Sequence, residues 1–475
     1  MKIASTVIMA FCLPVLLFSQ NSFEKDYSFD GIYHVYGKSV KQSSDGCYLS
    51  AGITFDAGYG PSIFMFKADE KGDSLWFETN WIYVQEEVPY KMLEQPGLGY
   101  VAGPSYYNPF MSNILCYLVQ TNFDGLRNWD DWYSGMYDYS FPVDFIINAD
   151  EKTIILNNSV SMNGNEELVM MHEIDSNGIQ LNTFSFPHDE DLSPICLIEK
   201  DDGGYLSAGF IGETSVLYLQ SISAGFDEEW MIPHDVLNQL VNPYYLSLLE
   251  QVNENITAVT STVNPDNNLA EGVILNFVTG GTLLEIHHIK QDYSIHFADA
   301  ILSSDGHIIV CGKILEFESA SETLLLYKIS TDGEIIWERY FHGLGIAAGY
   351  ALDQADDGGF AIAGMTRKSE QDLKRYYLLK TDEEGLVTST DKHPAVKNEF
   401  TLRPNPATDR VTLYPQNKRM NFNLMLVNSG GQQMMTLTGL KGAQEIDVGS
   451  FSPGIYLLRI ISGDHSIVKK IVVRR

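Results

Sequence analysis

One stretch of the sequence combines residue types that could bind a sugar. Between residues 129 and 139 aromatic side chains alternate with carboxylates, and more aromatic residues lie nearby at 81–83 and 106–110. Aromatic rings stack on the C–H faces of sugars, and carboxylates accept hydrogen bonds from hydroxyl groups. Aromatic residues also fill protein interiors, so burial of these rings is the alternative. The candidate ligand-binding residues are Trp129, Asp130, Asp131, Trp132, Tyr133 and Tyr137.

Residues for common catalytic and metal sites do not occur at the required spacing. The eleven histidines form no HExxH pair, and the chain contains no GxSxG elbow. His287 and His288 are neighbours on an expected strand, where they face opposite sides. Paired carboxylates are common, and those at Asp201–Asp202 and Asp356–Asp357 suit turn chemistry. We therefore predict no catalytic residue, no metal site and no cofactor.

The composition bounds the location and partners of the protein. The 475 residues carry a formal net charge of −31, and 44% of them are hydrophobic. Nucleic acids and anionic membrane surfaces attract clustered Lys and Arg, so we expect neither as a partner. Residues 1–20 place one lysine before an apolar run, which predicts a secretory signal peptide. No later segment has the roughly 20 apolar residues that span a bilayer, so we expect no membrane span.

Four cysteines follow the predicted signal peptide, at Cys47, Cys116, Cys196 and Cys311. An even number of cysteines in an exported protein permits disulfides. These four fall on expected strands without a CxxC pair or the spacing of metal ligands. Small buried thiols are the favoured interpretation, because free cysteine is among the most buried residue types.

A turn followed by a short apolar strand recurs seven times along the chain. Five clear copies and two degraded copies, at 149–158 and 253–261, occur. The clear copies are Ser43–Gly52, Glu94–Gly103, Lys200–Gly209, Ser303–Gly312 and Ala355–Gly364. A second glycine turn in each repeat gives four strands per repeat, which is typical of a propeller blade. The sequence therefore predicts an all-β fold with a seven-bladed β-propeller over residues 21–390. The copies are 51 to 55 residues apart when aligned at Gly52, Gly103, Asn158, Gly209, Thr260, Gly312 and Gly364.

The ends of the repeat array predict how the ring closes. Phe23–Tyr27 resembles the fourth strand of the sixth repeat, and the seventh repeat ends weakly. We therefore expect an N-terminal strand to complete the last blade and to cover its edge. Tryptophans recur near the start of the fourth strand and are expected to pack between blades or against a blade edge; they are Trp76, Trp129, Trp230 and Trp337.

The composition changes after residue 390. Residues 398–475 contain ten Lys and Arg against five Asp and Glu, in contrast to the acidic chain as a whole. This contrast marks a domain boundary, with residues 391–397 as a linker. Short β-like runs, among them 411–414, 423–427 and 454–461, predict a small Ig-like β-sandwich over residues 398–475.

Four short motifs occur in order along this tail. They are a Pro-Asn-Pro segment at 402–409, a strand and Gly-Gln turn at 427–432, a Gly-x-Tyr segment at 446–456 and a basic–apolar strand at 469–473. Together they resemble the type A C-terminal sorting domain of the Bacteroidetes type IX secretion system. The resemblance implies recognition of this tail by the secretion machinery, and export to the outer-membrane surface or the extracellular space. The matching residues are Pro404, Asn405, Pro406, Gly430, Gly454, Tyr456, Lys469 and Lys470.

The function of the propeller itself stays open between two classes. Its repeats resemble, more loosely, the Asp-Gly-Gly repeat propellers, which are named for their repeat and imply no chemistry. A non-catalytic module that binds a surface protein or a glycan through loops of one propeller face is favoured, because no catalytic constellation is recognisable. The alternative is a polysaccharide lyase or glycoside hydrolase that uses carboxylates on the same loops.

Overall fold

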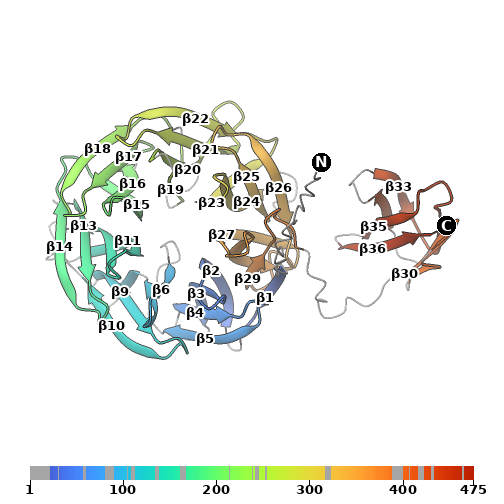
Figure 1. The fold of residues 1–475 in the computed structure, drawn as a ribbon, viewed down its shortest axis with the longest axis horizontal. Helices are drawn as coiled ribbons and strands as arrows, with labels where there is room; N and C mark the ends of the chain where they lie inside the picture. Colours follow the sequence, from blue (N-terminus) through green and yellow to red (C-terminus); the bar gives the residue numbers. More distant parts are fainter. Residues whose placement is uncertain are drawn as a thin grey trace, which may run out of the picture. The chain divides into compact units, whose positions relative to one another are not determined.

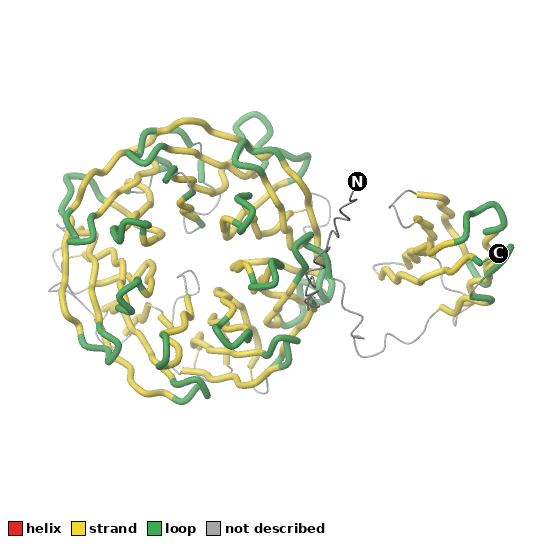
Figure 2. The backbone as a smooth tube through the Cα atoms, in the orientation of Figure 1, coloured by secondary structure: helices red, strands yellow, loops and turns green. Residues whose placement is uncertain are grey.

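The computed structural model consists of β-strands and turns, and the part of the chain that it describes contains no helix (Figures 1 and 2). None of its described segments is therefore a helix that could cross a membrane. The chain divides into two compact units, Met1–Ser389 and Thr390–Arg475. The predicted signal peptide at 1–20 and the predicted linker at 391–397 lie outside the described residues. The described residues are 22–29, 32–56, 60–80, 90–103, 105–108, 113–133, 139–160, 167–212, 214–237, 239–240, 245–251, 254–315, 322–387, 400–405, 407–415, 422–428, 433–462 and 465–474.

The first unit is a ring of seven antiparallel sheets, counted over the described strands, and it is the predicted seven-bladed propeller (Figure 1). Each sheet runs from an innermost strand to an outermost one. Blade one contains β2 (Ile32–Gln42), β3 (Tyr48–Asp56), β4 (Gly60–Ala68) and β5 (Ser74–Asn80). Blade two contains β6 (Lys91–Gln95), β7 (Gly99–Gly103), β9 (Asn113–Thr121) and β10 (Arg127–Tyr133), with β8 (Ser105–Asn108) also paired to β9. Blade three contains β11 (Tyr139–Ile147), β12 (Thr153–Val160), β13 (Glu167–Ile174) and β14 (Gln180–Phe186).

The remaining four blades repeat this order. Blade four contains β15 (Leu192–Glu199), β16 (Tyr205–Ile211), β17 (Leu217–Ile222) and β18 (Glu228–His234). Blade five contains β19 (Ser247–Glu250), β20 (Ile256–Val263), β21 (Ala270–Phe277) and β22 (Leu283–Ile289). Blade six contains β23 (Ser294–Leu302), β24 (Ile308–Leu315), β25 (Glu322–Ile329) and β26 (Ile335–Phe341). Blade seven contains β27 (Ile346–Gln354), β28 (Phe360–Arg367), β29 (Arg375–Lys380) and β1 (Phe23–Tyr27).

The last blade takes its outermost strand from the other end of the chain. Strand β1 pairs antiparallel with β29, with Phe23 opposite Lys380 and Tyr27 opposite Tyr376. Phe23 is buried, and the Tyr27 ring stacks on the Tyr376 ring at a centroid distance of 5.3 Å. The predicted closing strand is therefore confirmed. Because β1 covers the edge of β29, blade seven has four strands, and its outermost strand comes from the other end of the propeller sequence.

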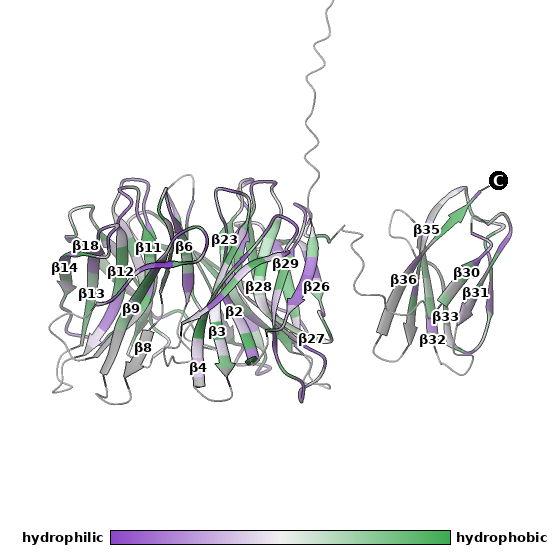
Figure 3. Cartoon of the chain, turned by 90° about the horizontal axis from the view of Figure 1, so that it is seen from below, coloured by the Kyte–Doolittle hydropathy of each residue, from purple (hydrophilic) through white to green (hydrophobic). Residues whose placement is uncertain are grey.

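The middle strands of the blades are buried on both faces. Every described residue of β7, β17 and β21 is buried, whereas the outermost strand β14 is largely exposed. Neighbouring blades cover both faces of the middle strands, so these strands are rich in apolar residues, and the polar residues concentrate at the turns (Figure 3). This arrangement explains the repeat pattern of the sequence, in which short apolar runs are bounded by hydrophilic turns.

In four of the clear repeats, the last glycine lies on a second strand, opposite a β-bulge in the first. In blade six, the β23 register shifts between Phe297 and Asp299. A Cβ atom on Gly312 would lie only 2.0 Å from the backbone oxygen of His296, so no larger residue fits. The same close approach to a first-strand carbonyl occurs at Gly52, Gly209 and Gly364.

The hairpin between the first two strands needs one residue with a positive φ. In blade one, Gly46 has a φ of 78°, and its N–H donates to the Ser43 oxygen at 2.8 Å. The Ser43 N–H donates in turn to the Cys47 oxygen at 2.8 Å, which closes the hairpin. In the degraded copies, Glu151 and Glu254 adopt this conformation with φ values of 60° and 65°. The predicted turn geometry therefore persists where the glycine has been lost.

The recurring tryptophans join four of the blades, the first, second, fourth and sixth, to the blade that follows. The ring of each tryptophan covers the positive-φ glycine in the turn that follows the third strand of the next blade. Phe23 of β1 covers Gly72 of blade one in the same way. The expectation that these rings pack between blades is thus confirmed. The pairs are Trp76–Gly125, Trp129–Gly178, Trp230–Gly281 and Trp337–Gly385.

All four cysteines described in the propeller are free thiols. Cys116, Cys196 and Cys311 are buried, as expected, whereas Cys47 is only half-buried in the first hairpin turn. Burial raises the pKa of each of the three buried thiols well above its usual value. They therefore act as small apolar side chains of the propeller core.

The second unit is a two-sheet β-sandwich, which matches the predicted architecture. Apolar residues from both sheets, among them Val411 and Leu458, form a common core. One sheet contains β30 (Phe400–Arg403), β31 (Arg410–Pro415) and β34 (Gln444–Asp447). The other contains β33 (Gln433–Leu440), β32 (Phe422–Asn428), β35 (Gly454–Ser462) and β36 (His465–Val473).

Candidate functional site

Two of the predicted ligand-binding aromatics are occupied in blade packing. The Trp129 ring lies on Gly178 of blade three, and its Nε1 donates to the Ser176 oxygen at 3.2 Å. Tyr133 is only 2% exposed, and its hydroxyl donates to the Gly178 oxygen at 2.7 Å. Both rings therefore hold blade two against blade three. They present little surface to a ligand.

The other described residues of this group lie on the outer wall of the ring. Strand β10 is the outermost strand of its blade, and it exposes Asp130, Asp131 and 40% of Trp132 (Figure 1). The Trp132 ring packs on Tyr117 at a centroid distance of 4.6 Å, and the Tyr117 hydroxyl donates to Asp130 at 2.9 Å. Tyr137 lies outside the described residues. The exposed part is thus one ring and two carboxylates on a convex surface.

A larger concave site lies at the centre of the propeller. The first strands β2, β6, β11, β15, β19, β23 and β27 surround a channel of about 930 Å³. Its wall carries aromatic residues, such as Tyr90 and Tyr350, and charged residues of both signs, such as Lys91 and Asp144. The candidate residues chosen from the sequence do not line this channel.

Hydrogen bonds between blades fix the wall of the channel. The side chain that follows the bulge in a first strand accepts a backbone N–H from the first strand of the next blade. Asp144 accepts from Leu197 at 3.0 Å, and Asp299 accepts from Leu352 at 2.9 Å. Serines make the same contact in two other blades, from Met92 to Ser39 at 3.1 Å and from Ala300 to Ser247 at 3.0 Å.

Charged side chains add to these hydrogen bonds in the channel wall. Lys91 Nζ lies 2.5 Å from an Asp144 oxygen, and its side chain is 37% exposed to the channel. Burial disfavours the charged form of Lys91, but the Asp144 carboxylate outweighs this effect and raises the Lys91 pKa. Burial also raises the pKa of Asp299, although backbone N–H groups partly oppose the shift. The Lys91 ammonium group thus stays charged in a position that a ligand in the channel could reach.

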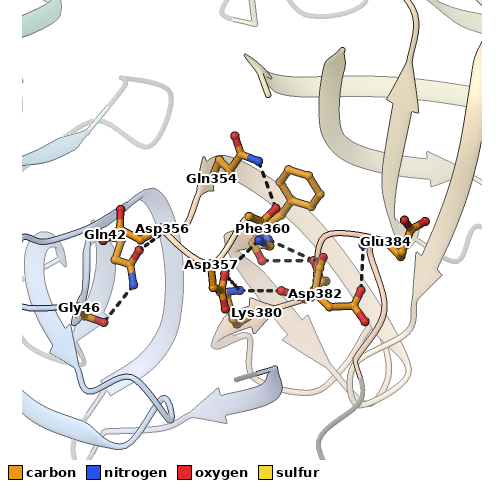
Figure 4. A network of polar contacts seen from close by, with 12 residues as sticks. Gln42, Gly46, Gln354, Asp356, Asp357, Phe360, Lys380, Asp382 and Glu384 are labelled. Carbon is orange, nitrogen blue, oxygen red and sulfur yellow. Dashed lines mark hydrogen bonds and ion pairs between the residues drawn. The ribbon is translucent and has the colours of Figure 1, made fainter. Parts of the chain in front are cut away.

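The carboxylates at the hairpin turns have structural partners. Figure 4 shows the junction of the last and first blades, where the Asp356 N–H donates to Gln42 Oε1 at 2.7 Å. In the same turn, Asp357 accepts from Gly359 at 3.0 Å and from Lys380 Nζ at 2.8 Å. Asp202 likewise accepts from the Gly204 N–H at 2.8 Å. The predicted turn role is therefore confirmed for Asp202 and Asp357, the second residue of each pair.

A smaller cavity adjoins the channel. It has a volume of about 280 Å³ and shares Lys38, Tyr245, Ala298 and Tyr350 with the channel wall. We call it the basic pocket, because lysine and arginine side chains form much of its lining. Elsewhere, no group of three or more His, Cys, Asp or Glu residues in the described part of the chain could hold a metal ion.

The sandwich brings the first and last motifs of the tail together. Asn405 Oδ1 accepts the Val472 N–H at 2.8 Å, and Ala407 forms a parallel bridge with Val473. Tyr456 is buried, and its hydroxyl donates to the Ser452 oxygen at 2.9 Å. The remaining motif residues are spread over exposed or undescribed positions. Pro404 and Gly454 are exposed, Lys469 is half-buried, and Pro406, Gly430 and the Lys470 side chain are not described.

Residues 401–474 match the family model of the secretion system C-terminal sorting domain. The tail is a sorting domain. It belongs to the type IX secretion system, as the four motifs implied, and it directs the protein to the outer-membrane surface or the extracellular space. No curated protein matches the chain in sequence.

Several solved structures resemble the chain at 10% to 11% sequence identity. PorZ, a surface component of the type IX secretion system of Porphyromonas gingivalis, has a TM-score of 0.45 at 11% identity, over 92% of this chain and 59% of that one. The propeller domain of the Trilobed protease from Pyrococcus furiosus has a TM-score of 0.44 at 10% identity, over 78% and 100%. The extracellular domain of BT3049 from B. thetaiotaomicron has a TM-score of 0.36 at 10% identity, over 93% and 68%.

Proposed function

We propose that the propeller is a non-catalytic binding module that the sorting domain delivers to the cell surface or the medium. The central channel is the observation that carries this proposal. It is concave, about 930 Å³ in volume, and lined by aromatic and charged side chains, which are the properties of small-molecule and glycan sites. Because hydrogen bonds between the blades hold its wall, a ligand would meet a largely preformed surface.

The ligand class is a glycan or a surface protein. Tyr350, which is half-buried, offers part of its ring face, and Lys91 offers a charged donor, both on the channel wall. The outer-wall group on β10 is a second candidate contact, reduced to Trp132 with its neighbours Asp130 and Asp131. A ligand bound by Trp132, Asp130 and Asp131 would lie on the outer wall of the propeller instead of in its central channel.

A glycan array with the full chain tests this function. Tyr350→Ala probes the channel, Trp132→Ala probes the outer wall, and Tyr414→Ala removes an exposed tyrosine of the tail as the matched control. We expect a specific glycan signal that Tyr350→Ala reduces at least tenfold and Tyr414→Ala leaves unchanged. Loss of the signal only in Trp132→Ala would move the site to the outer wall.

Two other outcomes would contradict the proposal. A wild-type chain that binds neither glycans nor extracted surface proteins would leave no ligand for the module. New reducing ends in an incubated polysaccharide would identify the alternative function, a lyase or hydrolase that uses carboxylates on the propeller loops.

A further inference from the structure

The central channel has walls of opposite charge. Among its described lining residues, every lysine comes from blade one or two, and every carboxylate comes from blades three to six. Strands β2 and β6 lie across the ring from β15 and β19 (Figure 1). Lys41 belongs to β2, whereas on the other side Glu199 ends β15, Asp201 lies in the turn that follows it, and Glu250 ends β19. We call these three acidic residues the carboxylate side of the channel.

The charge of the carboxylate side exceeds what the fold requires. Glu199 and Glu250 each accept a backbone N–H from the hairpin of the preceding blade, at 3.0 Å and 3.1 Å. Gln354 and Gln42 accept the corresponding N–H at two other blade junctions, at 2.8 Å and 2.7 Å. The contact therefore needs an oxygen acceptor and no negative charge.

No ion pair between described residues includes a member of the carboxylate side. The adjacent Lys200 is largely buried and pairs instead with Asp202 at 3.2 Å and with Glu229 at 3.0 Å. Burial raises the pKa of Glu250, the Asp201 N–H opposes this shift, and the charges of Asp201 and Asp202 add to it. A cation bound among these carboxylates would relieve their mutual repulsion.

Lys41 supplies the opposite charge. Its Nζ lies 2.7 Å from an Asp353 oxygen, yet 47% of its side chain is exposed. Asp353 is largely buried and also accepts the Gln42 N–H at 2.8 Å. Because an ammonium group has three donors, Lys41 can contact an anionic group of a ligand while Asp353 holds it in position.

Aliphatic residues form most of the rest of the channel wall. Ile146, Ile198 and Ile301 are half-buried and line the channel near the hairpins. Tyr350 lies further from the hairpins, at the bulge of β27. Sugars stack on aromatic rings, whereas aliphatic surface packs against the apolar side chains of a peptide. The hairpin end of the channel therefore suits a peptide better than a glycan.

We propose that the hairpin end of the channel binds a peptide segment with one basic and one acidic side chain, the basic group beside the carboxylate side and the acidic group beside Lys41. The opposite charges of the walls would fix the direction of the peptide, because a reversed peptide brings like charges together. The channel volume of about 930 Å³ lies at the upper end of the range for ligand pockets, which suits a short segment. This inference rests on the proposed binding function and selects the surface-protein class of ligand within it.

A peptide array probed with the labelled full chain tests the proposal. The probes are capped hexapeptides with one lysine, one glutamate and four leucine or serine residues, at every spacing of the two charges and in both orders. Their relatives carry glutamine in place of the lysine, of the glutamate or of both. We expect at least one mixed-charge peptide to bind tenfold or more tightly, measured by calorimetry, than each of its three glutamine relatives.

Variants of the channel wall assign each charge of the peptide to its partner. Glu199→Gln/Glu250→Gln keeps both backbone acceptors, and it should weaken binding at least tenfold and remove most of the advantage of the peptide lysine over glutamine. Lys41→Gln should remove the advantage of the peptide glutamate in the same way. Glu94→Gln is the matched control, because Glu94 accepts the Ser44 N–H at 2.6 Å but does not line the channel. It should bind the peptide like the wild type.

The two proposals fail separately. A glycan signal that Tyr350→Ala reduces, without a mixed-charge peptide that binds better than its glutamine relatives, would support the binding function and overturn the peptide site. Equal losses in Glu94→Gln and Glu199→Gln/Glu250→Gln would also overturn it. If the double variant unfolds, Glu199→Gln and Glu250→Gln measured singly should each weaken binding, and unchanged binding in both would contradict the site. A chain that binds no peptide, glycan or extracted surface protein would contradict both proposals.

Discussion

Glycines at two positions of each clear repeat have different physical roles. The turn glycine, such as Gly306 with a φ of 81°, supplies a backbone conformation, and a Cβ there would meet nothing within 4 Å. The strand glycine, such as Gly312, supplies space for the His296 carbonyl at the bulge. The bulge then directs Asp299 toward the backbone of the next blade. The strand glycine therefore supports the wall of the channel, although Gly312 itself does not line it.

Alanine at these two positions should have unequal effects on stability. Gly306→Ala adds only the strain of a left-handed alanine, about 1 kcal/mol of unfolding free energy. Gly312→Ala forces a Cβ against a backbone oxygen, so we expect a loss of about 3 kcal/mol or more. Urea unfolding of both variants beside the wild type measures the difference. Equal losses would contradict the role assigned to the bulge.

Lysine–aspartate pairs at the turns should make stability depend on pH. Lys67 Nζ lies 2.6 Å from Asp45, and Lys328 Nζ lies 2.5 Å from Asp305. Burial disfavours each carboxylate, but hydrogen bonds from the lysine and the turn serine outweigh it and hold both aspartate pKa values well below their usual range. A lowered folded-state pKa stabilises the protein above the unfolded pKa of about 4, and this stabilisation is lost as the pH falls further.

The variant Asp45→Asn/Asp305→Asn tests that dependence. Both carboxylates are half exposed, so each pair contributes under about 1 kcal/mol, and we expect Tm to fall by about 2–4 °C at pH 7. The difference from the wild type should shrink steadily below pH 4. Asp124→Asn, in an exposed outer turn, is the control and should leave Tm unchanged. A difference that stays constant down to pH 2 would show that protonation of these pairs is not involved.

At the scale of elements, local and non-local features of the sequence differ in what they predict. The hairpin turns depend on a few adjacent residues, so their glycines and aspartates predicted five of the blades, and the spacing of about 50 residues identified the two degraded copies. The closing strand was predictable because β1 repeats the pattern of β26. The hydrogen bonds that Asp144 and Asp299 accept from the next blade could not be predicted in this way. Their partners lie in another repeat, about 50 residues away. Trp129 also serves blade packing, and a tryptophan that covers a glycine has the same sequence pattern as one that covers a sugar.

The closing strand should determine the stability of the whole ring. Without residues 21–30, the edge of β29 is exposed, and the contacts of Phe23 with Gly72 and of Tyr27 with Tyr376 are lost. Burial of two aromatic side chains is worth several kcal/mol, so we expect Tm to fall by more than about 10 °C. Calorimetry of the deletion variant, compared with a chain that lacks only residues 1–20, measures the effect. An unchanged Tm would mean that the ring closes without β1.

At the scale of the whole molecule, the chain joins a strongly acidic propeller to a mildly basic sorting domain. The propeller core is complete within the first unit, and the sandwich has a separate core formed by its own two sheets. The sorting motifs depend on the sandwich fold, since Asn405 and Val472 are neighbours only after folding. Sequence motifs were sufficient to predict this domain because sorting residues recur in a fixed order. The wall of the central channel has no such order, because it is assembled from seven separate first strands.

Because the propeller and the sandwich have separate cores, we expect the propeller to fold without the sorting domain but to need it for export. A chain that ends at residue 390 lacks the sorting domain, so in a host with a type IX secretion system we expect it to accumulate in the periplasm instead of at the surface or in the medium. Its propeller should keep the melting transition of the full chain within about 2 °C, because residues of the sandwich do not belong to the propeller core. Cell fractionation with calorimetry measures both properties. The variant Asn405→Ala is a second, more specific test, because it removes only the hydrogen bond from Val472 that connects the first and last motifs. We expect it to reduce export and to leave the melting transition of the propeller unchanged. Surface display of the truncated chain would show that the propeller itself carries a second export signal.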